Sequence, residues 1–190
     1  MPVHAVRRLA RTAGRLVQFA LLAVPLAGSA NPALQQTCDT GSYPLSTPTS
    51  RFQEHDDGTV TDSQSNLMWL RCSIGQEWSG TDCVGSAGEF SWSEAQELAK
   101  AENARGTHFY SDWRLPKLQE LATIAERQCR NPRINLALFP QTPAAAYWSL
   151  TLRPGADAQD SAFVLSFGAE GVGFERTDAR HHVRLVRSGP

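Results

Sequence analysis

Seven arginines form two groups whose spacing could serve the recognition of anions. They are Arg127, Arg130 and Arg133, and, nearer the C-terminus, Arg176, Arg180, Arg184 and Arg187. Guanidinium groups bind carboxylate and sulfate oxygens through paired hydrogen bonds. Ordinary solvated surface charge is the alternative explanation. We take four of them as candidate contacts for an acidic or sulfated glycan: Arg130, Arg133, Arg184 and Arg187.

Tryptophans are the second kind of residue that could contact a glycan. Trp78, Trp92 and Trp148 each present an apolar aromatic face on which a sugar ring can stack. In a small disulfide-bonded domain a tryptophan more often belongs to the core, and that alternative stays open. Trp78 and Trp148 are the candidate stacking residues.

Signatures of metal or catalytic chemistry are weak. Asp56, Asp57 and Asp62 could ligate calcium, but no EF-hand spacing is present and an Asp-Gly hairpin turn explains the same residues. His181 and His182 are adjacent, so on a strand they point to opposite faces, and we expect solvated or edge positions for them. The sequence predicts no catalytic residue, no metal site and no cofactor.

The four cysteines are Cys38, Cys72, Cys83 and Cys129. An even number in an exported chain favours disulfides. Cys72 and Cys83 flank a short segment containing glycine and serine, which favours a local bridge and leaves Cys38 to pair with Cys129. A Cys₄ zinc site is the alternative, but no C-x-x-C spacing supports it.

The first thirty residues have the pattern of a secretory signal peptide. A basic region with Arg7, Arg8, Arg11 and Arg15 precedes a short apolar run over residues 16–26 and then small residues. The apolar run is short for a membrane span. We expect cleavage after residue 30, no membrane span in the mature chain, and a periplasmic, surface or secreted location.

Charge argues against a nucleic-acid partner. The chain has 18 basic and 19 acidic residues, and four of the basic ones but none of the acidic ones lie in the first thirty. The remainder therefore carries 14 basic against 19 acidic residues, a net charge of −5 with neutral histidines. General nucleic-acid binding needs a strongly basic face, although a local basic patch is still compatible with this balance.

The elements that must position these side chains centre on Asp112, Trp113, Arg114 and Pro116. Proline is favoured at the first position of a helix, and apolar residues then recur at helical spacing, which predicts a helix from Pro116 to about Arg127. We expect Trp113 to bury its ring while Asp112 and Arg114 pair or bond backbone groups around it. These residues either join converging loops or build a ligand site.

The other elements predict an α+β fold with an antiparallel sheet and two main helices on one side. Ser91 and Glu94 have capping-box spacing, and Gly106 marks the end of that helix. The extended N-terminal leader covers residues 31–50 and the folded domain residues 51–188. The predicted strands lie at 59–61, 67–71, 147–151, 161–167, 171–177 and 182–187.

Several short motifs together resemble one known family. They lie at 58–62, 67–69, 72–78, 91–95, 112–116, 129–132 and 183–187. The chain resembles the Lcl C-terminal domain family, a domain of unknown function named after the Legionella collagen-like adhesin, from about Arg51 to Ser188. The resemblance implies a C-type-lectin-like fold and an exported bacterial module. In the namesake adhesin the domain binds sulfated glycosaminoglycans and forms a trimer, and the resemblance implies the same two properties here.

A second, shorter resemblance concerns an enzyme. Arg114 to Glu120 is similar to a segment of the formylglycine-generating enzyme fold, which uses a cysteine pair late in its chain, whereas the last cysteine here is Cys129. The calcium-dependent lectin signatures Glu-Pro-Asn and Trp-Asn-Asp are absent. We therefore predict a non-catalytic binding or adhesion module for acidic or sulfated glycans. The alternative is a structural or accessory subunit of a pilus or cell-envelope assembly that binds a protein partner.

Overall fold

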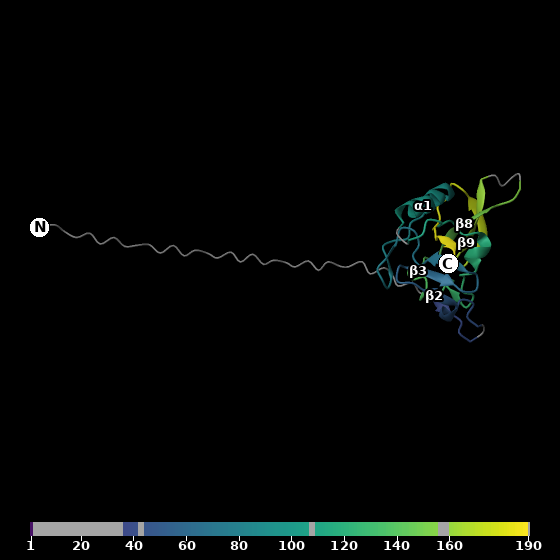
Figure 1. Cartoon of the computed structure of the whole chain (residues 1–190), viewed down its shortest axis with the longest axis horizontal. Coiled ribbons are helices and arrows are strands. Elements are labelled where there is room, and N and C mark those ends of the chain that lie inside the picture. Colours follow the sequence, from purple (N-terminus) through teal and green to yellow (C-terminus); the bar gives the residue numbers. More distant parts are fainter. Residues whose placement is uncertain (2–35, 42–43, 107–108, 156–159, 190) are drawn as a thin grey trace. The chain divides into compact units, whose positions relative to one another are not determined.

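The computed structural model describes residues 1, 36–41, 44–106, 109–155 and 160–189 (Figure 1). Residues 2–30 of the predicted signal peptide and the first residues of the leader lie outside these ranges. The described residues from 36 onward belong to one unit, Ala33–Pro190. In this part of the chain no helix has the length and apolarity needed to cross a bilayer.

A four-stranded antiparallel sheet contains the predicted Asp-Gly hairpin. Its strands are β2 (Phe52–Glu54), β3 (Thr59–Asp62), β4 (Leu67–Leu70) and β11 (Val186–Ser188), in the order β11-β4-β3-β2. Gly58 has a φ of 83°, which a turn of this kind requires of a glycine. Every residue of β3 and β4 is buried, so this hairpin is covered on both faces, as the unbroken apolar run of β4 indicates.

A second antiparallel sheet has three strands. They are β8 (Ala146–Leu152), β9 (Ser161–Ser166) and β10 (Val172–Arg176), in the order β10-β9-β8. Two further pairs consist of two residues per strand. They are β1 (Thr37–Cys38) with β7 (Cys129–Arg130), and β5 (Glu77–Trp78) with β6 (Cys83–Val84).

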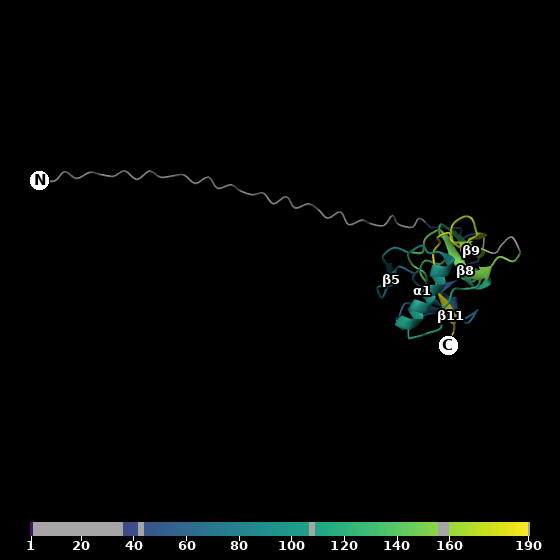
Figure 2. The ribbon, with the colours of Figure 1, turned by 90° about the horizontal axis from the view of Figure 1, so that it is seen from above.

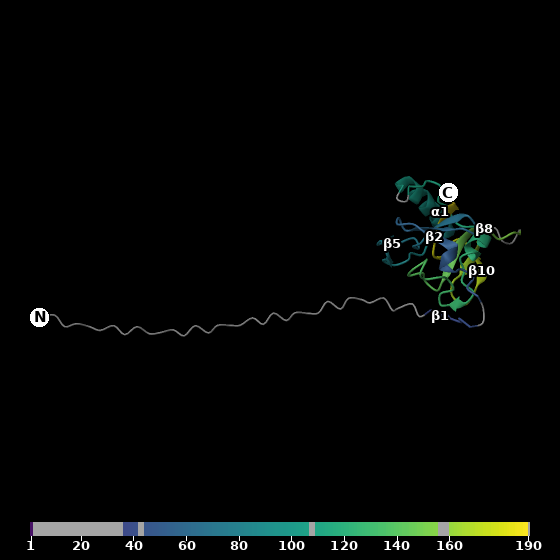
Figure 3. The same cartoon turned by 60° about the horizontal axis from the view of Figure 1, so that its bottom comes forward.

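The first predicted helix is confirmed. Helix α1 (Trp92–Arg105) begins at a capping box in which the Ser91 hydroxyl and the Glu94 carboxylate accept each other's backbone N–H, and it ends at Gly106 with a φ of 61°. It packs its buried alanines, Ala95 and Ala99, into the core beside residues of β4. Figures 2 and 3 show α1 next to the sheet that contains β11.

The second predicted helix is much shorter than expected. Helix α2 covers only Leu118–Ala122, with Lys117 as its N-cap, and a single 3₁₀ turn, η1, covers Thr49–Arg51. Pro116 precedes α2, and its carbonyl accepts a hydrogen bond from Leu150. Beyond α2 the chain forms an isolated bridge with Ile134. Backbone pairing with distant segments therefore replaces the helix predicted up to Arg127.

The C-terminal segment forms a regular strand over only part of the predicted range 182–187. Val183 to Val186 are all buried, and regular pairing begins only at β11. His181 forms a bridge with Phe90, and His182 forms one with Tyr147 of β8. The segment therefore connects the two sheets and is covered on both sides. The predicted solvent exposure is wrong for His182, which is 7% exposed and lies with Nδ1 2.8 Å from the Gly88 carbonyl.

Both predicted disulfides are confirmed. Cys72 is bonded to Cys83 across the loop that carries β5 and β6, and Cys38 is bonded to Cys129 across 91 residues. Cys129 lies in β7 and not at the end of a helix. The fold is thus α+β-like, with mostly antiparallel sheets, one substantial helix instead of two, and two disulfides.

The core consists of two apolar clusters. One surrounds Trp69 and Tyr147, and the other surrounds Trp148, Trp113 and the alanines of α1. In Figure 3 β1 and α1 lie toward opposite ends of the folded part.

Candidate functional site

The six predicted ligand residues do not form a single site. Arg130 and Arg133 line one hollow, whereas Trp78 lines a different one. Arg187 is half-buried and bonded to Asp112. Arg184 and Trp148 have no exposed surface. The hollows of the structure and the two buried residues, Arg184 and Trp148, are therefore described one by one.

The first hollow, which we call the basic hollow, brings together the arginines of the first sequence group. Its volume is about 330 Å³, and its lining comprises Asp39, Arg127, Gln128, Cys129, Arg130, Asn131, Arg133, Gly168 and Ala169. Arg127 and Arg130 are exposed and Arg133 is half-buried. Among the described residues none of these three guanidinium groups has a hydrogen-bond or ion-pair partner, whereas Asp39 supplies a carboxylate at the same hollow.

The basic hollow is built on the β1–β7 pair. Thr37 pairs with Arg130, and the amide of Asp39 donates to the carbonyl of Gln128 at 2.8 Å. The Cys38–Cys129 disulfide joins the same two strands. On the other side the Arg133 amide donates to the carbonyl of Phe167, the residue that directly follows β9, and this bond fixes the backbone of Arg133.

Glu126 organises the backbone beside this hollow. Its side chain is buried and accepts hydrogen bonds from Ser46 and Thr47, through both their amides and their hydroxyls, and from the Gln128 amide. The Ser46 hydroxyl in turn accepts from the Arg127 amide at 2.9 Å. Burial acts to raise the pKa of the Glu126 carboxyl, but the hydrogen bonds from Gln128, Thr47 and Ser46 outweigh it and lower the pKa to about 2.

A second hollow, the polar hollow, shares Arg127 with the first. Its volume is about 430 Å³, and its lining comprises Ser46, Arg51, Gln64, Ser65, Ala122, Thr123, Ala125 and Arg127. Arg51 is already bonded to the buried carboxylate of Asp62 and to the carbonyls of Ser46 and Thr123. The charge of Arg51 is therefore balanced within the protein, and apart from the shared Arg127 the lining is polar and uncharged.

The third hollow, the tryptophan hollow, contains Trp78. Its volume is about 320 Å³, and its lining comprises Asp57, Gly58, Leu70, Cys72, Ser73, Ile74, Gln76, Glu77, Trp78, Glu102 and Arg105. The guanidinium of Arg71 lies 4.3 Å from the centre of the Trp78 ring and is itself paired with Glu54 at 2.8 Å. A Cβ on Gly58 would lie 2.6 Å from Cγ of Trp78, so the indole packs directly against the hairpin turn.

A comparison with known protein families decides where the chain belongs. Residues 58–187 match the model described as the Lcl C-terminal domain. The chain belongs to the Lcl C-terminal domain family. The resemblance inferred from the short motifs is thus confirmed, and this family associates the chain with adhesins. A search of curated proteins found no match.

The matched range of the Lcl C-terminal domain includes the three arginines of the basic hollow, whereas Asp39 and Arg51 precede it. The N-terminal residues that complete both hollows therefore lie outside the matched range. The two disulfides are consistent with an extracellular location for this member of the family.

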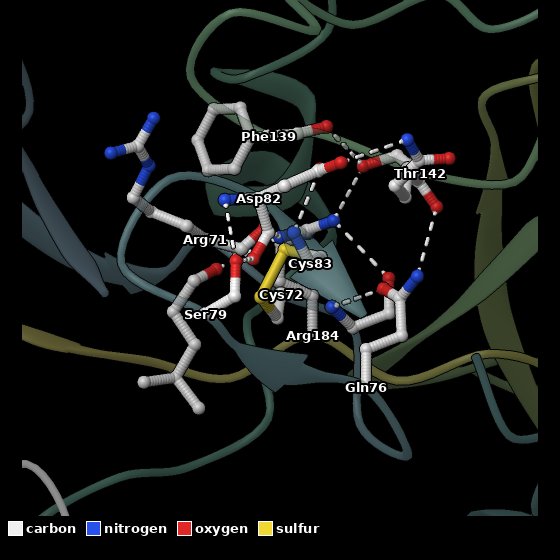
Figure 4. The surroundings of a disulfide bond; sticks show 12 residues. Arg71, Cys72, Gln76, Ser79, Asp82, Cys83, Phe139, Thr142 and Arg184 are labelled. Carbon is white, nitrogen blue, oxygen red and sulfur yellow. Dashed lines mark hydrogen bonds between the residues drawn. A yellow bond between two sulfur atoms is a disulfide. The ribbon is translucent and has the colours of Figure 1, made fainter. Parts of the chain in front are cut away.

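Arg184 of this Lcl C-terminal domain is an internal residue, so its prediction as a surface contact is wrong. It donates to the Leu70 and Arg71 carbonyls, to the Ser73 hydroxyl at 3.2 Å and to the Thr142 hydroxyl at 2.7 Å (Figure 4). Burial lowers the pKa of Arg184. The side chain holds the end of β4 and the start of the Cys72–Cys83 loop against the C-terminal segment.

Trp148 is also internal, and its prediction as a surface stacking residue is wrong. Its ring has no exposed surface, its Nε1 donates to the Phe90 carbonyl at 2.7 Å, and the His181 ring lies 4.7 Å from it, centre to centre. The reason is the course of residues 181–186 between the sheets, which covers the face of β8 that carries Trp148.

The motif around Trp113 forms a junction of loops. Trp113 is buried as expected, but Asp112 pairs with Arg187 at 2.6 Å, and Arg114 binds both carboxylate oxygens of Glu120 at 2.7 and 2.8 Å. Burial acts to raise the pKa of Glu120, but the bonds from Arg114 lower it overall. The guanidinium of Arg187 also lies 3.9 Å from the centre of the Tyr110 ring.

The carboxylates considered for calcium have other roles. Asp57 accepts from the amide and hydroxyl of Thr59 within the hairpin turn, and Asp62 is bonded to Arg51. Within the described ranges no group of three or more His, Cys, Asp or Glu side chains is placed to hold a metal ion.

Proposed function

We propose that this Lcl C-terminal domain is an exported, non-catalytic adhesion module that binds an acidic or sulfated glycan in the basic hollow. The observation that supports the proposal is the convergence of Arg127, Arg130 and Arg133 on one hollow without a guanidinium partner among the described residues. A C-type-lectin-like fold, expected from the resemblance, belongs to the same proposal.

Sulfate and carboxylate groups suit such a hollow for two reasons. A guanidinium presents parallel N–H donors whose geometry matches two oxygens of one anion. Arg133 is half-buried, so an anion bound to it is less screened by water than one bound to a fully exposed arginine. The chain from residue 31 onward carries a net negative charge, so the basic hollow is a local positive region on a mostly negative protein.

The test compares variants that remove the same charge in different places. Heparin-derived tetrasaccharide binding is measured by calorimetry at low and high salt for the wild type, for Arg130→Gln with Arg133→Gln, and for Arg176→Gln with Arg180→Gln as the control that also removes two exposed positive charges. Arg180 is exposed and contacts Glu94 of α1. We expect the variant of the basic hollow to lose at least about tenfold in affinity while the control stays at wild-type affinity. Salt-insensitive binding, or equal losses in both variants, would refute the proposal.

A protein partner is the second candidate, and exposed apolar residues of the second sheet favour it. Val172 and Phe174 on β10, which lies at the edge of its sheet, and Leu152 at the end of β8 are each about half exposed. Edge strands with apolar side chains are common docking sites. If a pilus or envelope subunit binds there, Phe174→Ser abolishes the association and leaves glycan affinity unchanged. A trimer, expected from the resemblance, is tested by sedimentation of the same variant.

A further inference from the structure

The basic hollow and the polar hollow share one residue, Arg127. Arg127 lines both, so a ligand in one hollow that extends past this residue enters the other. The Arg127 amide is fixed by the Ser46 hydroxyl, which is bonded to the buried Glu126 carboxylate. A hydrogen-bonded network therefore holds the backbone of Arg127, the residue at which the two hollows meet.

The two hollows differ in charge. In the basic hollow three guanidinium groups face a single carboxylate among the described lining residues. In the polar hollow the positive charge of Arg51 is balanced by Asp62, so the shared Arg127 is the one lining guanidinium without a partner among the described residues, and the other lining groups are hydroxyl, amide and methyl groups. Gln64 is exposed there, and the structure gives its side-chain amide no partner among the described residues. An amide of this kind both donates to and accepts from hydroxyl groups.

The volumes limit what each hollow holds. At about 330 and 430 Å³ both lie near the lower end of small-ligand pockets, roughly 300–1,000 Å³. Each is suited to a short piece of a chain molecule, and a longer ligand gains by occupying both, because the second contact is then intramolecular.

We infer that the glycan bound by this protein spans both hollows, with an acidic residue in the basic hollow and an uncharged, hydroxylated residue in the polar hollow. This inference rests on the proposed function and adds a selection for charge pattern and length. Arg127 contacts the ligand where it crosses between the hollows. A chain that is charged at every unit leaves the polar hollow without matching partners.

The experiment measures the affinities of three probes by calorimetry: a heparin-derived disaccharide, a tetrasaccharide in which the same disaccharide is extended by two uncharged sugars, and a short inorganic polyphosphate. Each is titrated into the wild type, Arg130→Gln, Gln64→Ala and the control Gln53→Ala, since Gln53 is exposed on β2 and lines neither hollow. We expect Gln64→Ala to weaken tetrasaccharide binding about fivefold and to leave the disaccharide and polyphosphate at wild-type affinity. Arg130→Gln weakens all three.

Two results would overturn the inference in distinguishable ways. Equal affinities for disaccharide and tetrasaccharide, with Gln64→Ala behaving like Gln53→Ala, remove the polar hollow from the site but keep the proposed function as long as Arg130→Gln still weakens binding. Absence of binding by any probe, or binding that Arg130→Gln does not change, removes both the inference and the proposed function.

Discussion

The basic hollow and the tryptophan hollow have nearly the same volume, about 330 and 320 Å³, yet they differ in how their polar groups are used. Beside the tryptophan hollow, Arg71 covers Trp78 and binds Glu54 as well as the carbonyls of Ala137 and Leu138. In the basic hollow the guanidinium groups have no such partner among the described residues.

This difference shows that a binding surface is better recognised by arginine donors without partners in the protein than by an arginine close to an aromatic ring. An arginine near an aromatic ring looks like a recognition site in the sequence, but its donors are already used if carboxylates and carbonyls surround it. Unused donors that converge on a hollow still have their interaction energy to offer to a ligand. The following predictions test this contrast.

The largest effect is expected from Arg184, which is completely buried and donates to four acceptors inside the protein. Arg184→Gln removes donors from the Leu70 and Arg71 carbonyls inside the protein. Unpaired buried acceptors are costly, so the free energy of unfolding should fall by about 3–5 kcal/mol. Urea denaturation followed by tryptophan fluorescence measures it. A loss below about 1 kcal/mol would instead mean that Arg184 contributes no more to stability than an arginine on the surface.

Glu126 should have the next largest effect, and it should depend on pH. Its pKa is about 2 in the folded protein against 4.5 as the reference value, so it stabilises the fold fully above pH 4.5, and this stabilisation is lost as the pH falls towards 2. The loss amounts to about 3 kcal/mol. Glu126→Gln should remove most of that pH dependence and weaken glycan binding, because the network that fixes Arg127 is broken.

Urea denaturation of the wild type and Glu126→Gln at pH 7 and pH 3 tests this expectation. Glu97→Gln is the matched control, because Glu97 is exposed on α1 and pairs only with Lys100 in the described structure. If Glu126→Gln loses stability between pH 7 and pH 3 as steeply as the wild type, the acid sensitivity lies in another carboxylate.

One substitution in each hollow compares the two hollows directly. Trp78→Phe should reduce the free energy of unfolding by about 1 kcal/mol without altering glycan affinity, since the smaller ring still packs on Gly58. Arg133→Gln should show the reverse, with affinity reduced about tenfold and stability unchanged. Thermal unfolding and calorimetry on both variants measure the two quantities. Loss of glycan affinity in Trp78→Phe would move the site to the tryptophan hollow.

The smallest effect should come from the carboxylate at the basic hollow. Asp39→Asn removes a negative charge that competes with an anionic ligand for the arginines, so affinity should rise about two- to threefold at low salt. The gain should vanish at high salt, because exposed charges are screened. An unchanged affinity at low salt would mean that Asp39 is too far from the bound anion.

Local signals predicted much of the fold. The Asp-Gly turn, the Ser91–Glu94 capping box and Gly106 act through residues close in sequence, and they appear as expected. The cysteine pairing followed from spacing and elimination and is also confirmed. In these cases the physical cause lies within a few residues or among few combinations.

Long-range contacts account for what the sequence could not reveal. The helix expected up to Arg127 stops at Ala122 because the following residues pair with segments near residues 46 and 134. An arginine in an alternating segment has the same pattern whether its neighbours are water or carbonyl oxygens, so Arg184 was indistinguishable from Arg187. Of the candidate site, Arg130 and Arg133 were identified, Arg127 was noticed but not selected, and nothing pointed to Glu126 or Gln64.

The Cys38–Cys129 bond also bears on when the binding surface comes into existence. The ladder between β1 and β7 is only two residues long, too short to persist without a covalent link. In a newly synthesised chain with reduced thiols, most of the core would be formed, but β1 would not yet be fixed beside the arginines of the basic hollow. Under the proposed function, oxidation after synthesis would then be the step that completes the glycan-binding surface.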